Sequence, residues 1–115
     1  MNEFSLTLTD EQEQLRDWIH QFCVDVVRPN AEEWDEREEF PWPIVQEAAK
    51  IGLYGWGFLA QGMIGDKTGL TMPVAIEELF WGDAGIGMAI MGSGLAAAGI
   101  AASGTQEQVM EWVPQ

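Results

Sequence analysis

The feature that most constrains the fold of this 115-residue chain is a segment without a single charge, residues 84–106. A segment of this kind is stable only inside a protein core or in a membrane. It consists mostly of Ala and Gly, its glycines are never four residues apart, and Asp83 and Glu107 flank it in place of Lys or Arg. The Gly-xxx-Gly motif of membrane helices is therefore absent. We expect a helix from about Gly85 to Ser103 that is buried on most sides of a soluble domain, with a membrane span as the less favoured alternative.

The glycines inside this predicted helix need a reason, because each costs about 1 kcal/mol relative to Ala. They are Gly87, Gly92, Gly94 and Gly99. One explanation is close packing against another helix, and the other is a bare surface that lets a ligand approach the backbone. Composition favours packing and leaves the second explanation open.

Helical periodicity also organises the first half of the chain. Thr9 and Gln12 form a capping-box pattern, and apolar residues then recur at three- and four-residue spacing. Pro29 should kink the helix or make it restart. A second helix is predicted over 43–51, with Gly52 placed to cap it.

The second half is predicted to contain three more helices, over 71–83, 85–103 and 106–113. The first of these has Met72, Ile76, Leu79 and Phe80 on one side, and residues 55–70 before it are predicted to form a loop. There is no β pattern. The sequence therefore predicts a single all-α domain over 1–115, with about five helices in an orthogonal-type arrangement.

The charge balance excludes some partners. The formal net charge is −14, from 19 acids and five bases, which argues against nucleic acid and anionic membranes. The acid-rich run 32–39 is expected to be a solvated face. Cys23 is the sole cysteine, so no intrachain disulfide is possible. Because the N-terminus also lacks signal-peptide features, we expect a cytoplasmic location.

Few residues could carry chemistry. His20 and Cys23 lie three apart on the first helix, but their place in or beside its apolar stripe favours packing over a reactive pair. No Cys and His cluster suggests zinc, and neither Asp66 nor Asp83 has an evident partner. We therefore predict no catalytic residue and no metal site.

Taken in order, several segments resemble the start of acyl-CoA dehydrogenases. The resemblance covers nearly the whole chain and rests on Leu8–Arg16, Val27–Pro29 with Ala31–Asp35, Phe40–Val45 with Ala49–Gly55, Ile76–Asp83, and Gly104–Gln108 with Trp112–Pro114.

The resemblance implies a flavoprotein that oxidises an acyl-CoA thioester between its α and β carbons and passes a hydride to FAD. Such enzymes have a helical N-terminal domain, a middle β domain and a C-terminal helical bundle, and the last two supply the catalytic glutamate and most flavin contacts. This chain resembles only the first domain, so by itself it is expected to be inactive and to hold no tightly bound FAD. It would be a fragment, the favoured interpretation, or a natural short subunit. A homo-oligomer or a partner subunit supplying the missing domains is expected.

By the same resemblance, the helix over 86–102 lines the base of the acyl pocket. The residues expected to face the acyl tail are Met88, Met91, Gly92, Leu95 and Ala98. Small side chains there would leave room for a long or bulky acyl group. The loop 59–69 departs from the Tyr-Gly-Gly-x-Gly pattern of the family. The rival interpretation is an acidic helical interaction module without a ligand, in which the glycine helix packs against a second copy.

Overall fold

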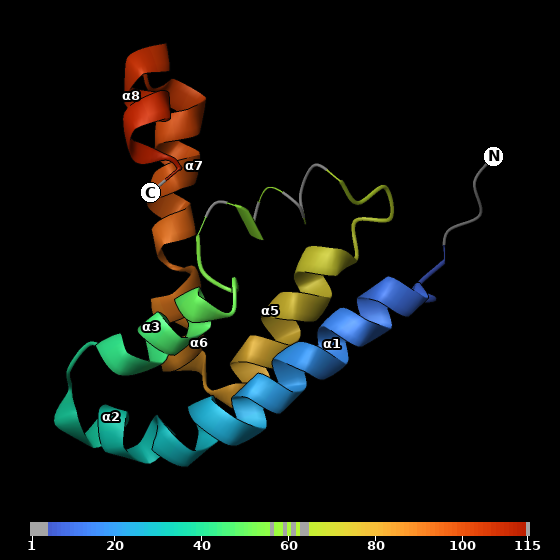
Figure 1. The fold of residues 1–115 in the computed structure, drawn as a ribbon, viewed down its shortest axis with the longest axis vertical. Coiled ribbons are helices and arrows are strands. Elements are labelled where there is room, and N and C mark those ends of the chain that lie inside the picture. Colours follow the sequence, from blue (N-terminus) through green and yellow to red (C-terminus); the bar gives the residue numbers. More distant parts are fainter. Residues whose placement is uncertain (1–4, 56, 59, 61, 63–64, 115) are drawn as a thin grey trace.

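The computed structural model describes residues 5–55, 57–58, 60, 62 and 65–114, which contain helices and no strand. The prediction of an all-α domain is confirmed, and each of the five predicted segments is helical. Figure 1 shows the arrangement, in which the α-helices are α1 (Asp10–Phe22), α2 (Ala31–Arg37), α3 (Trp42–Lys50), α5 (Thr71–Gly82), α6 (Ala84–Met91), α7 (Ser93–Ser103) and α8 (Gln106–Trp112).

The path from α1 to α2 shows how the chain accommodates Pro29. A π-helical turn, Cys23–Val27, and a 3₁₀ turn, Arg28–Asn30, join the two helices. Proline has no N–H to donate, and its ring clashes with the carbonyl four residues earlier in a regular α-helix. Widening and then tightening the helix avoids both problems. The predicted kink is therefore confirmed, and so is the capping box, in which the Thr9 hydroxyl accepts from the Gln12 N–H at 3.2 Å.

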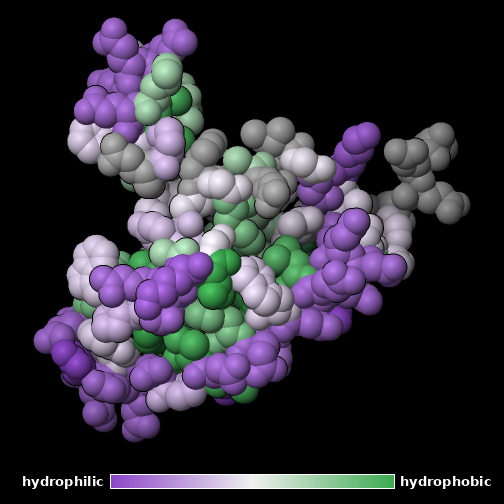
Figure 2. All heavy atoms as spheres, viewed as in Figure 1, coloured by the Kyte–Doolittle hydropathy of each residue, from purple (hydrophilic) through white to green (hydrophobic). Residues whose placement is uncertain are grey.

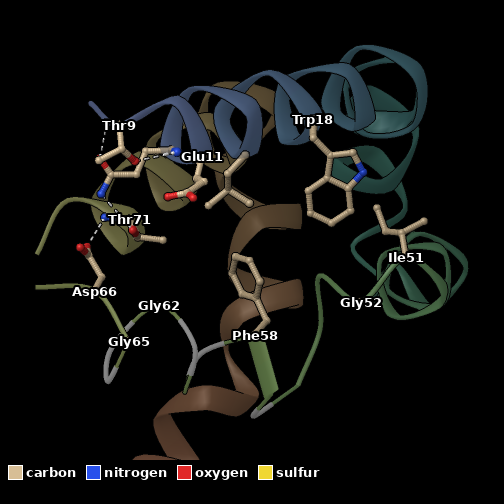
Figure 3. Close-up of a pocket in the computed structure, with 12 residues that line it drawn as sticks. Thr9, Glu11, Trp18, Ile51, Gly52, Phe58, Gly62, Gly65, Asp66 and Thr71 are labelled. Carbon is tan, nitrogen blue, oxygen red and sulfur yellow. Dashed lines mark hydrogen bonds between the residues drawn. The ribbon is translucent and has the colours of Figure 1, made fainter. Parts of the chain in front are cut away.

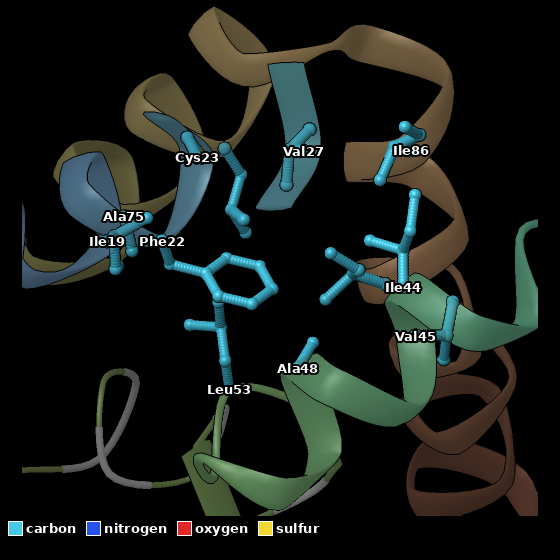
Figure 4. Close-up of a cluster of buried hydrophobic side chains, with 12 residues drawn as sticks. Ile19, Phe22, Cys23, Val27, Ile44, Val45, Ala48, Leu53, Ala75 and Ile86 are labelled. Atoms are coloured by element: carbon cyan, nitrogen blue, oxygen red, sulfur yellow. The ribbon is translucent and has the colours of Figure 1, made fainter. Parts of the chain in front are cut away.

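The core lies where α1, the π turn, α3, α5 and α6 meet (Figure 4). Its largest fully buried side chains are Ile19, Cys23, Val27, Leu53, Leu79 and Ile90. Helix α3 contributes Ile44, Val45 and Ala48 to this cluster. Gly52 follows α3 with a φ of +81°, the left-handed conformation that glycine adopts without strain. The turn brings Leu53 into the core.

One glycine allows α5 to approach the π turn closely. A Cβ atom at Gly82 would lie 2.8 Å from the Cys23 Sγ atom and 3.1 Å from a Val27 methyl carbon. Both distances are shorter than van der Waals contact. The absence of a side chain at Gly82 therefore fixes the distance between the two segments.

The uncharged segment divides at Gly92 into two helices with different surroundings. Helix α6 buries Ile86, Gly87 and Ile90, whereas α7 has no buried residue. Helix α7 leaves the core and packs against α8, so that the two form an arm (Figure 1). The prediction that this segment is buried on most sides is correct for α6 and wrong for α7. The lack of charge in α7 favours burial of this helix, but none of its residues is buried by the described part of the chain.

The segment Ala84–Ser103 is also long and apolar enough to cross a membrane, and only 17% of its most apolar window is buried. Length and composition are the whole basis for that possibility. On the face that Figure 2 shows, hydrophilic side chains lie along α1 and α2, and apolar side chains reach the surface between them.

Candidate functional site

The five residues predicted to face an acyl tail follow one side of α6 and α7. Met88 is 46% exposed and Leu95 is 71% exposed, while Met91 packs partly against the core. Ala98 is exposed on α7. Their spacing of three and four residues places Met88, Met91, Leu95 and Ala98 on a common flank. The described residues do not enclose this flank as a whole, and Met88 at its end also lines a cavity whose other lining residues include four carboxylates.

Gly92 stands at the junction of the two helices. Its N–H donates to the Met88 carbonyl at 2.7 Å, and its own carbonyl accepts from the Leu95 N–H at 3.1 Å. A Cβ atom at this position would lie 2.6 Å from the Met88 carbonyl oxygen. The absence of a side chain at Gly92 therefore allows the backbone to bend between α6 and α7.

The other glycines divide between the two explanations that the sequence left open. A Cβ atom at Gly87 would lie 3.0 Å from the Cδ2 atom of Phe80, so Gly87 is a packing glycine. A Cβ atom at Gly99 would meet nothing within 4 Å, so Gly99 belongs to a bare surface. Packing explains Gly87 in α6, and open space surrounds Gly99 in α7.

Phe80 is a residue whose role the sequence pattern did not reveal. We expected it to face inward with Ile76 and Leu79, but Ile76 and Phe80 are both more than one-third exposed. The inward stripe of α5 is Ala75, Leu79 and Gly82. The prediction was wrong because large apolar side chains were taken to be the buried ones, whereas close helix packing here buries Ala and Gly.

A cavity of about 510 Å³, here called the acid-rimmed pocket, lies between α2, the connector 38–41 and α6. Trp34, Phe40, Ile86 and Met88 supply apolar surface, and the carboxylates at its rim are Asp35, Glu38, Glu39 and Asp83. The Asp83 carboxylate accepts from the Ile86 N–H at 2.8 Å and so caps α6. Asp83, which had no evident partner in the sequence, therefore has a structural role.

A second cavity of about 640 Å³ lies between α1 and the segment that precedes α5 (Figure 3). Leu15, Trp18, Ile51 and Phe58 line its apolar side. At its polar end, the buried Gln12 amide donates to the hydroxyls of Thr68 at 2.8 Å and Thr71 at 3.1 Å. These bonds tie the start of α1 to the start of α5.

Asp66 completes this polar end. Its carboxylate accepts from the hydroxyl of Thr68 at 2.7 Å and from the N–H of Thr71 at 2.9 Å. These hydrogen bonds, the Thr68 hydroxyl first, hold the pKa of Asp66 well below its usual range. Asp66 thus has the partners that the sequence did not indicate, and it accepts from the N–H of Thr71, the first residue of α5.

The His20 and Cys23 side chains are structural. Cys23 is fully buried, its thiol donates to the Glu78 carbonyl at 3.4 Å, and burial raises its pKa to about 11. His20 lies 2.8 Å from the Glu78 carboxylate and stacks on Trp81. The Arg28 guanidinium lies 4.3 Å from the centre of the Trp81 ring. The packing interpretation is confirmed, because a thiol of this kind holds its proton at neutral pH.

Neither cavity has the chemistry that a dinucleotide needs. No Lys or Arg is among the residues that line them, while carboxylates line both. The flavin pyrophosphate is an anion, so these carboxylates would repel it. The described residues also contain no group of three His, Cys, Asp or Glu side chains placed to hold a metal ion.

Comparison with known proteins identifies the family to which this helical domain belongs. The chain belongs to the acyl-CoA dehydrogenase family. Within it, residues 9–115 match the family model described as acyl-CoA dehydrogenase, N-terminal domain.

Three curated relatives illustrate the range of the similarity. The chain is 30% identical to a probable mitochondrial medium-chain specific acyl-CoA dehydrogenase 2 of Caenorhabditis briggsae, over 96% of this chain and 27% of that protein. It is 32% identical to (2S)-methylsuccinyl-CoA dehydrogenase of Cereibacter sphaeroides, over 94% and 20%. It is 34% identical to the short-chain specific acyl-CoA dehydrogenase of Clostridium acetobutylicum, over 92% and 28%. The chain spans about a quarter of the length of these relatives.

Proposed function

We propose that this domain forms one wall of the acyl-binding site in a flavin-dependent enzyme that oxidises acyl-CoA thioesters between the α and β carbons. The observation that carries the proposal is the open, uncharged flank of α6 and α7. Met88, Met91, Leu95 and Ala98 lie there at helical spacing, and Met88 and Leu95 are exposed, in a chain whose formal net charge is −14. An acyl tail needs apolar surface without charges, and this flank offers it.

The same proposal accounts for the exposure of the arm. Helix α7 lacks a cover among the described residues, and an exposed apolar strip of this length is stable when another protein surface packs on it. Middle β and C-terminal helical domains, joined in one chain or supplied by partner subunits, would provide that cover and close the acyl site. The catalytic base would come from those domains, since no described residue is placed for that role.

FAD would likewise be held outside this domain. The two cavities do not fit its pyrophosphate, because carboxylates and no bases line them. The chain alone is therefore expected to bind no flavin. In the assembled enzyme, its own residues would orient the acyl tail and keep water away from it.

The test uses the domain assembled with the middle and C-terminal domains and measures flavin reduction by acyl-CoA thioesters of increasing chain length. We expect activity with at least one thioester. Replacing Ala98 by Leu should lower kcat/KM for long acyl groups about tenfold or more, because the added side chain takes up pocket space. Ala96→Leu is the matched control: it is equally exposed on α7 and lies about 160° around the helix from Ala98. Equal effects of the two substitutions would contradict the proposal.

The open face around Gly99 also supports the alternative of an acidic interaction module whose glycine helix packs against a second copy. This alternative predicts concentration-dependent dimerisation of the isolated chain in analytical ultracentrifugation, which Leu95→Glu would abolish. It further predicts that no thioester reduces the flavin of the assembled protein. A membrane anchor would instead make the chain insoluble without detergent.

A further inference from the structure

Phe80 lies against the part of α6 that leads into the proposed acyl-facing flank. It belongs to the last turn of α5, next to the buried Leu79, but its ring points toward α6 and remains 37% exposed. A Cβ atom at Gly87 would lie 3.0 Å from the Cδ2 atom and 3.2 Å from the Cε2 atom of this ring. The ring therefore occupies the space that a side chain at position 87 would fill.

The helical register places this contact at the edge of the acyl-facing flank. Successive residues of an α-helix are about 100° apart, so Gly87 lies about 40° from Met91 and about 20° from Ala98. Met88 and Leu95 lie on the opposite edge of the same flank. An acyl group that follows this flank toward Gly87 would meet the Phe80 ring.

Resting on the proposed function, we propose that Phe80 closes the acyl pocket over Gly87 and so sets the upper limit of the acyl length that the enzyme accepts. The small residues of the helix by themselves suggested room for a long acyl tail. At Gly87 that room is already filled, because the ring of Phe80 covers the glycine. An aromatic ring provides a flat apolar wall with no polar atom, which suits the methyl end of an acyl chain.

The experiment uses the assembled enzyme, Phe80→Ala, and straight-chain acyl-CoA thioesters from short to long. We expect the acyl length with the highest kcat/KM to increase by about two carbons. The thioester that is two carbons longer than the wild-type optimum should gain about tenfold or more in kcat/KM. Even one additional methylene in an apolar pocket contributes about tenfold or more. Calorimetric binding of the corresponding enoyl-CoA products should show the same shift without turnover.

Two variants separate pocket filling from general damage to α5. Trp81→Ala removes a neighbouring aromatic of similar exposure that faces His20 and Arg28 instead of α6, so it should leave the acyl-length profile unchanged. Adding Gly87→Leu to Phe80→Ala should refill the space and restore the wild-type acyl-length profile. If Phe80→Ala fails to fold, Phe80→Leu keeps apolar bulk and should give a smaller shift in the same direction.

The outcomes are distinguishable. Absence of flavin reduction by every thioester in the wild-type assembled enzyme contradicts the proposed function itself. Activity with an identical length profile in wild type, Phe80→Ala and Phe80→Leu leaves the proposed function intact and overturns the role of Phe80. A shift that Trp81→Ala reproduces also overturns it, because the cause would then be loosening of α5.

Discussion

The core and the arm of this domain are made of similar residues but differ in what surrounds them. Helix α6 is rich in Gly, Ala and Ile, and it buries Ile86, Gly87 and Ile90 against the rest of the core. Helix α7 is likewise uncharged, with five Ala and two Gly among its 11 residues, and it buries nothing. The lack of charge in a helix therefore predicts that another surface packs on it. It does not show whether that surface belongs to the same domain or to another part of the protein. Substitutions that are alike in chemistry should therefore have unlike effects in the two regions.

The largest contrast is expected between two leucines. Leu79 is fully buried in the core, while Leu95 is 71% exposed on α7. Leu79→Ala should lower the free energy of unfolding of the isolated chain by about 2–5 kcal/mol, through lost burial and a cavity. Leu95→Ala should change it by less than about 0.5 kcal/mol. Urea titration of both variants measures the contrast. A similar loss for both would mean that α7 is covered in the isolated chain, for example by a second copy.

Two glycine substitutions should have effects of opposite sign. Gly82→Ala should destabilise the chain by about 1–3 kcal/mol, because its Cβ would lie 2.8 Å from the Cys23 Sγ atom. Gly99→Ala should stabilise α7 by about 0.5–1 kcal/mol, since Ala favours the helix and nothing lies within 4 Å of the new atom. Thermal unfolding measures the first effect, and hydrogen exchange of α7 amides measures the second. Destabilisation by Gly99→Ala would show that something packs on that face.

Much of this fold could be predicted from local signals. The Thr9 capping box, the interruption at Pro29 and the turn at Gly52 follow from the chemistry of one or a few neighbouring residues, and the structure confirms each of them. The orientation of α5 could not be predicted in the same way. Its buried stripe consists of Ala75, Leu79 and Gly82, and the advantage of burying small residues appears only once the π turn lies against them.

The candidate site was harder to predict for a similar reason. The resemblance implied Met88, Met91, Gly92, Leu95 and Ala98, and nothing in the described residues encloses them, so their role remains a proposal. Phe80 carries no local signal, because a large apolar residue in a helix is equally typical of a core. A Gly and a Phe seven residues apart reveal their contact only when α5 and α6 are placed side by side.

The two capping boxes offer a matched comparison with a smaller effect. Thr9 caps α1 in the core region, and Thr105 caps α8 in the arm with the same pair of hydrogen bonds. Thr9→Ala should lower the global free energy of unfolding by about 1 kcal/mol. Thr105→Ala should increase exchange of the first α8 amides and leave global unfolding nearly unchanged, because the arm opens separately. Equal global losses would show that core and arm unfold as one cooperative unit.

The smallest effect concerns the pH dependence of the link between α1 and α5. Because the pKa of Asp66 is lowered in the folded state, its contribution to stability is present above the ordinary carboxyl pKa of about 4 and is lost as the pH falls through the lowered value. Asp66→Asn removes the charge and should weaken the hydrogen bonds to Thr68 and Thr71. The difference in unfolding free energy between wild type and Asp66→Asn should thus be constant near neutral pH and shrink below about pH 4. Asp35→Asn, on the exposed face of α2, is the control for the removal of one carboxylate. A difference for Asp66→Asn that stays constant down to about pH 2 would mean that the charge of Asp66 contributes nothing to holding α5 against α1.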